Sequence, residues 1–87
     1  MITGTTTSGF AYEITDDALN DWELIEDLVR IDAGQPGTMV SALRRLIGEE
    51  GYKALKEHCR GQNGRVAAST MMHELEDIFN TAKPLKN

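Results

Sequence analysis

The chain has 87 residues, enough for one domain, and carries 14 acidic and 9 basic side chains for a formal net charge of -5. This acidic balance argues against general nucleic-acid binding, which needs Lys and Arg to replace phosphate counterions. Cys59 is the single cysteine, so no disulfide can form within the chain, and no apolar run approaches the ~20 residues of a membrane span. With no secretion signal recognisable at its start, we expect a cytoplasmic protein with no membrane partner.

The charges are unevenly distributed along the chain. Residues 1–34 carry eight acids and one base, residues 35–66 three acids and six bases, and residues 67–87 three acids and two bases. Two interpretations stay open, attraction between neighbouring helices and a binding surface with two signs of charge. The first is the simpler.

Residues 1–9 are rich in Thr, Ser and Gly and predict a flexible arm, because they offer little apolar surface to bury. The apolar residues Phe10, Tyr12 and Ile14 then alternate with a small and an acidic residue, which predicts a short extended segment. The sequence offers no clear second strand. We therefore expect this segment to pack along the helices or to pair with another copy.

The clearest predicted helix runs from about residue 20 to about residue 32. Its start has the form of a capping box, in which Asn20 accepts from a free backbone amide and Glu23 reaches back. Its apolar residues cover an arc of about 180°, whereas a core-facing stripe needs about 100°. Leu24 and Ile31 lie toward one edge of that arc, so the helix has more apolar surface than a core requires.

Three further helices are expected, at about residues 38–47, 49–60 and 67–81. Gly48 separates the first two, and Asn63-Gly64 predicts a tight turn before the last.

In the last helix, Met72 and Phe79 lie at one edge of the apolar stripe. A short tail that contains Leu85 follows, because Pro84 forbids further helix. The predicted fold class is therefore all-α: a small four-helix bundle with a short extended N-terminal segment. Its expected parts are a flexible arm (1–9), a helical domain (10–82) and a tail (83–87).

No pattern in the sequence predicts a catalytic residue, a cofactor or a metal. His58 and Cys59 are adjacent, so on a helix they point about 100° apart and cannot easily face one ion. His73 lacks the second histidine four residues on that a helical zinc site needs. Cys59 is better interpreted as a small core residue.

Charged residues on the predicted helices also favour ordinary explanations. The carboxylates of Glu23, Glu26 and Asp27 fit a solvated helix face better than an acid–base pair. A helix-turn-helix would use residues 67–81 as its recognition helix, but the exposed face of that helix is acidic and would repel DNA. We therefore expect neither an enzyme nor a nucleic-acid partner.

Apolar side chains at the stripe edges and in the tail are the candidate partner-binding residues, since exposed apolar patches mark protein interaction sites. They are Leu24, Ile31, Met72, Phe79 and Leu85. The alternative is that all five lie in the core or beneath the arm and tail.

The order of several short segments resembles a known family. The segments are residues 8–13, with two aromatic side chains, the acidic 21–26, then 46–50 and 55–58, the Asn-Gly turn at 63–66, residues 74–79, and a Lys-Asn terminus. Over residues 8–87 this pattern is similar to the small tail assembly chaperones of long-tailed bacteriophages and prophages of Gram-positive bacteria.

The resemblance implies a function in tail morphogenesis. Such chaperones are small, helical and absent from the finished virion, and they keep the tape-measure protein soluble while tail-tube subunits polymerise around it. The implied partners are the tape-measure protein and, second, the tail-tube protein; no cofactor is implied. A longer frameshifted form is also expected if an A-rich slippery stretch encodes residues 85–87.

Two further expectations complete the sequence-based interpretation. Self-association is compatible with apolar stripe edges, since these can pair with copies of themselves. The alternative function is a small acidic regulator that inhibits a basic, nucleic-acid-binding protein through the face spanning residues 16–32.

Overall fold

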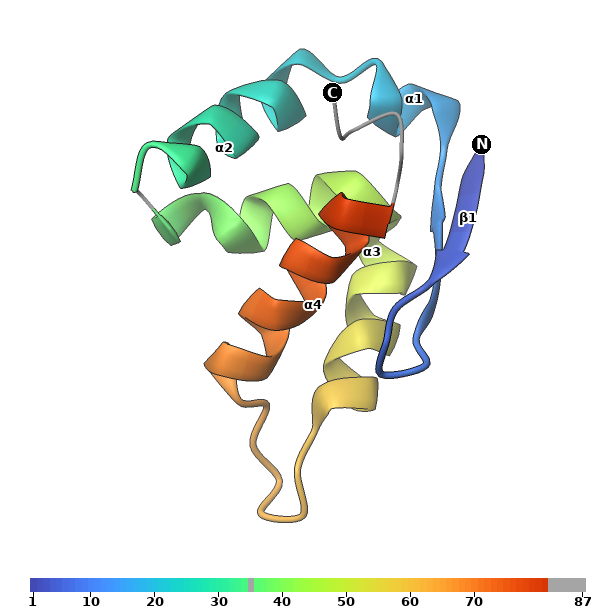
Figure 1. Cartoon of the computed structure of the whole chain (residues 1–87), viewed down its shortest axis with the longest axis vertical. Helices are drawn as coiled ribbons and strands as arrows, with labels where there is room; N and C mark the ends of the chain where they lie inside the picture. Colours follow the sequence, from blue (N-terminus) through green and yellow to red (C-terminus); the bar gives the residue numbers. More distant parts are fainter. Residues whose placement is uncertain (35, 82–87) are drawn as a thin grey trace.

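The computed structural model describes residues 1–34 and 36–81. The elements in chain order are β1 (Ile2–Thr5), β2 (Ala11–Ile14), α1 (Asp16–Leu19), α2 (Trp22–Asp32), the 3-10 helix η1 (Pro36–Thr38), α3 (Met39–Cys59) and α4 (Ala68–Thr81). The all-α prediction is wrong, because the described residues form a two-stranded antiparallel sheet as well as helices. Figure 1 shows the hairpin standing beside α3 and α4, with α2 across one end.

The first nine residues contain a strand, so the predicted flexible arm is also wrong. β1 pairs antiparallel to β2, with Ile2 opposite Ile14 and Gly4 opposite Tyr12. Gly4 of β1 has no side chain, and the Tyr12 ring fills the space over it. A Cβ atom at Gly4 would lie 2.6 Å from Cζ of that ring. The Tyr12 hydroxyl then reaches Thr81 Oγ1 at the end of α4, 2.7 Å away.

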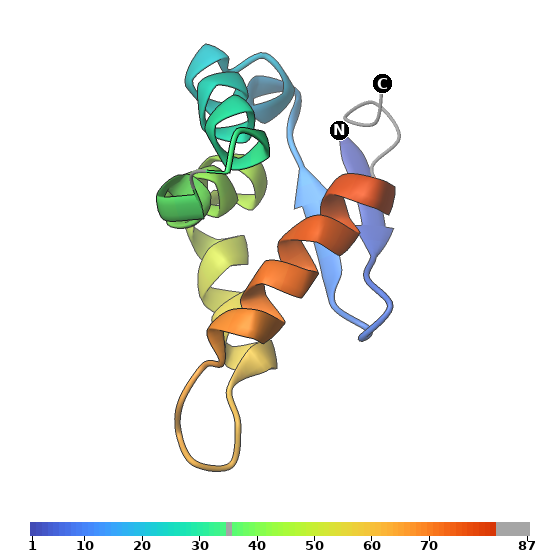
Figure 2. The same cartoon turned by 60° about the vertical axis from the view of Figure 1, so that its left-hand side comes forward.

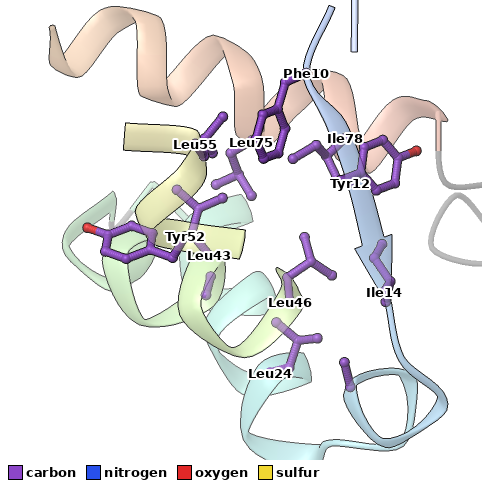
Figure 3. Packing of buried hydrophobic residues seen from close by; sticks show 12 residues of the cluster. Phe10, Tyr12, Ile14, Leu24, Leu43, Leu46, Tyr52, Leu55, Leu75 and Ile78 are labelled. Atoms are coloured by element: carbon purple, nitrogen blue, oxygen red, sulfur yellow. The ribbon is translucent and has the colours of Figure 1, made fainter. Parts of the chain in front are cut away.

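The core lies where the hairpin, α3 and α4 meet. Ile14 of β2, Leu55 of α3 and Ile78 of α4 are fully buried, and Figure 3 shows side chains from all three elements converging there. β1 contacts α4, and β2 contacts α3. From the side, the end of α4 lies beside the hairpin and its start lies beside the second half of α3 (Figure 2).

Gly48 divides α3 into two helical segments, as the sequence predicts. It has φ 79° and ψ 167°, a backbone conformation that is essentially restricted to glycine. Residues 39–47 and 49–59 therefore run in different directions (Figure 1). The tight turn predicted at Asn63-Gly64 is also present, closed by a hydrogen bond from the Gly61 amide to the Arg65 carbonyl, 2.8 Å.

The start of α2 differs from the predicted capping box. Asp21 is the N-cap, and its Oδ1 accepts from the amides of Glu23 at 2.9 Å and Leu24 at 3.3 Å. Asn20 instead ends the single turn of α1, which Thr15 caps. The extra turn displaces the start of the longer helix by one residue. Within the described residues, no helix is both long enough and apolar enough to cross a membrane.

The bend at Gly48 gives the first testable prediction. Gly48→Ala places a side chain in a conformation that costs about 1–3 kcal/mol, so thermal unfolding followed by circular dichroism should shift to lower temperature. Gly37→Ala is the matched control, because a Cβ atom there meets nothing within 4 Å and the residue has no positive φ. Equal midpoints for the two variants would show that the bend does not depend on glycine.

Candidate partner-binding surface

Helix α2 presents a row of large apolar side chains to solvent. Trp22, Ile25 and Val29 are 71%, 45% and 62% exposed. Their spacing of three and four residues places them on one face of the helix. We call these three residues the α2 row. Scattered apolar residues are ordinary on a protein surface, but a contiguous row that includes a tryptophan indicates a surface for protein binding.

The opposite edge of α2 faces the core. Leu24 is 2% exposed, and Leu28 and Ile31 are partly buried against the core cluster. The excess of apolar surface on this helix was predicted, but placing Leu24 on an exposed edge is wrong. Ile31 is likewise packed against the core, so the surface open to a partner is the other edge of the arc.

The remaining candidates lie elsewhere. Met72 on α4 is 47% exposed, on the stripe edge where the sequence places it, and Phe79 is partly buried. Leu85 lies outside the described residues. Met72 and Phe79 lie on α4, whereas the α2 row lies on α2. Both helices pack against α3.

A buried acid explains why Leu24 faces inward. Asp27 shares its side of α2, is buried, and accepts a hydrogen bond from the Ser41 hydroxyl at 2.6 Å. Arg45 Nε lies 3.7 Å from the same carboxylate. Because these partners lie on α3, the side of α2 that carries Asp27 packs against α3, and the α2 row faces solvent. If Asp27 is paired with the basic middle of the chain, its side of α2 must be buried and the α2 row must be exposed.

Arg45 also forms ion pairs with two acids at the start of α2. One of its guanidinium nitrogens lies 3.4 Å from an Asp21 carboxylate oxygen and 3.3 Å from one of Glu23. Three acids in the first third of the chain are thus paired with a base in its middle third. These pairs fit the simpler interpretation of the charge distribution, attraction between neighbouring segments.

A second polar cluster joins the hairpin loop to α4. Glu74 is almost fully buried, and its Oε1 accepts from the hydroxyls of Thr6 at 2.9 Å and Ser8 at 3.0 Å. His58 Nε2 lies 3.0 Å from the Ser8 oxygen, and its ring lies 5.5 Å from that of Phe10. The cluster holds the loop against both helices.

The Ser8–His58 pair has the opposite polarity to a catalytic dyad. A nucleophilic serine gives its proton to the histidine. Here the single hydroxyl proton of Ser8 goes to the Glu74 carboxylate, so His58 acts as the donor to Ser8. Burial raises the pKa of the neighbouring Cys59 thiol, and the Glu74 charge raises it further. The thiol is therefore a weak nucleophile.

Potential metal ligands do not gather at one place in the described part of the chain. No group of three or more His, Cys, Asp or Glu residues there could hold a metal ion. A groove of about 570 Å³ lies between the hairpin and α3. Its lining combines small residues with Phe10 and Ile47, and its ionisable groups are Glu13, Glu50 and the Tyr12 hydroxyl. We assign it no ligand.

The loop contact with α4 predicts a specific pH dependence. Asp77 Oδ2 accepts from the Thr7 amide at 2.6 Å and the Thr7 hydroxyl at 3.0 Å. The hydrogen bond from the amide holds the pKa of Asp77 below its ordinary 3.8. Because folding lowers this pKa, the contact contributes stability above the pKa of the unfolded chain. That contribution is lost as the pH falls through the lower folded value.

An NMR titration of the Thr7 amide resonance measures this directly. We expect a midpoint below pH 3.8 in the folded protein, and no such transition in Asp77→Asn, which cannot titrate. A midpoint at or above 3.8 would show that the amide does not stabilise the charged carboxylate.

No protein-family model, curated protein or solved structure matches this chain. The α2 row is therefore the feature from which a function can be inferred.

Proposed function

We propose that this chain is a tail assembly chaperone that binds the tape-measure protein of a long-tailed phage through the α2 row. The observation that carries the proposal is the exposure of Trp22, Ile25 and Val29 on one helix face. The resemblance over residues 8–87 supplies the identity of the partner. On this proposal the protein acts in the host cytoplasm, is absent from the finished virion, and has no catalytic role.

The form of the row suits a helical partner. Anchors spaced three and four residues apart complement the apolar stripe of an amphipathic helix. A tape-measure protein is a long chain with much apolar helical surface, so many equivalent segments of it would meet this description. Each bound copy would cover one of them until tail-tube subunits replace it.

The size of the row favours weak and reversible binding at each site. Fully burying one large apolar side chain contributes about 1.5–3 kcal/mol, so three partly exposed ones contribute on the order of 4 kcal/mol. Association of two proteins costs about 4–15 kcal/mol in lost freedom. A single row would therefore hold its partner only briefly, and coverage would depend on many copies along one chain. This is the behaviour that a chaperone displaced during assembly needs.

The internal charge pairing weighs against the alternative, an acidic regulator of a nucleic-acid-binding protein. That function needs the acids of residues 16–32 to face the partner. Asp21, Glu23 and Asp27 are instead engaged by Arg45. Fewer acids are left for a basic partner than the sequence suggests.

The test is co-expression with the longest helix-rich protein encoded beside this chain. The protein should keep that neighbour soluble, and Val29→Asp should reduce its soluble yield about tenfold, because a charge in the row opposes burial. Val40→Asp is the matched control, since Val40 on α3 is also half exposed. Met72→Asp tests separately whether α4 contributes.

Two results would contradict the proposal. The neighbour could be equally soluble without this protein, or Val29→Asp and Val40→Asp could have equal effects while both variants stay folded. Either result would remove the link between the α2 row and chaperone function.

A further inference from the structure

We infer that the α2 row binds an amphipathic helix whose apolar stripe is bordered by Lys or Arg on both sides. The inference rests on the proposed function and adds the charge pattern of the bound segment. It comes from the two acids that flank the row. At about 100° per residue, Glu26 lies about 40° from Trp22 on one side, and Asp32 lies about 20° from Ile25 on the other.

These flanking acids differ from the other acids of α2. Glu26 and Asp32 are both exposed, and neither forms an ion pair within residues 1–34 and 36–81. Glu23 and Asp27, in contrast, are held by Arg45. The carboxylates that border the row therefore form no ion pair within the described residues and are exposed, so a partner's cations can reach them.

The same acids disfavour a second copy of this chain as the occupant. Two α2 rows packed face to face would bring the Glu26 and Asp32 carboxylates of one copy toward those of the other. Like charges facing each other across an interface are unfavourable, and each chain already has a net charge of -5. The charge pattern thus favours a different, basic partner over self-association.

The geometry also specifies where the cations of the partner lie. Glu26 and Asp32 are six residues apart, which is about 9 Å along the helix axis. A matching partner helix has basic residues on opposite sides of its stripe, offset by about the same distance. Long Lys and Arg side chains can reach these positions while their stems cover the edges of the row.

Trp22 gives a direct readout of binding, because it is the only tryptophan in the chain. The probes are two synthetic peptides of about 18 residues, long enough to form a helix and free of tryptophan. They share one leucine stripe, and they differ only in having Lys or Glu along its borders. Titration of each into the full chain follows the Trp22 emission.

The Lys-bordered peptide should shift the emission saturably to shorter wavelength and bind about tenfold more tightly than the Glu-bordered one at low salt. The difference should shrink as salt screens the exposed pairs. The double variant Glu26→Lys with Asp32→Lys should reverse the preference. The control pair Glu50→Lys with Glu76→Lys makes the same change in net charge at exposed positions outside α2, and should leave the order of the two peptides as it is.

The outcomes separate this inference from the proposed function. Equal binding of the two peptides, or a concentration-dependent Trp22 shift without peptide, overturns the inference. So does binding of neither peptide while Val29→Asp still abolishes solubilisation of the long partner, and in that case the proposed function stands. Selective binding of the Lys-bordered peptide without any solubilisation supports the inference and overturns the tape-measure assignment.

Discussion

The arrangement of the other elements depends on the bend at Gly48. A straight helix as long as α3, 21 residues, would be a rod about 31 Å long. The bend instead gives its two halves separate neighbours. In the first half, Ser41 and Arg45 contact Asp27 of α2. In the second half, His58 contacts the hairpin loop. Because α2 packs on the first half through its Asp27 face, its opposite face, the α2 row, is left in solvent.

The longer helices and the extended segment at β2 could be predicted from the sequence, but the short helix α1 and the pairing of β2 with β1 could not. Apolar spacing located α2 and α4 closely, and Gly48 and Asn63-Gly64 marked real changes of chain direction. β1 was missed because its burial depends on a tertiary contact. Gly4 adds no apolar surface by itself, and its role appears only when the Tyr12 ring lies over it. The pattern of apolar residues in β1 cannot show that the Tyr12 ring of β2 covers Gly4.

The sequence indicated the helix that carries the candidate site but not the residues of the α2 row, for a related reason. The width of the apolar arc showed that α2 has more apolar surface than a core needs. Which edge is buried depends on the neighbour, and the neighbour here binds Asp27 through Ser41 and Arg45. The sequence analysis placed the Asp27 carboxylate in solvent, whereas it is buried on the Leu24 side of the helix. The side chain of Met72, in contrast, lies on the edge that periodicity indicates.

The hydrogen bonds of the hairpin loop join residues far apart in the chain. Thr6 and Glu74 are separated by 68 positions, and Thr7 and Asp77 by 70. During synthesis the hairpin therefore emerges long before the helix that anchors its loop, and contacts of such long range form slowly. Until α4 is complete, the hydroxyls of Thr6 and Thr7 lack the carboxylates of Glu74 and Asp77 that they contact in the folded protein. The contacts between this loop and α4 can therefore form only after almost all of the described chain has been synthesised.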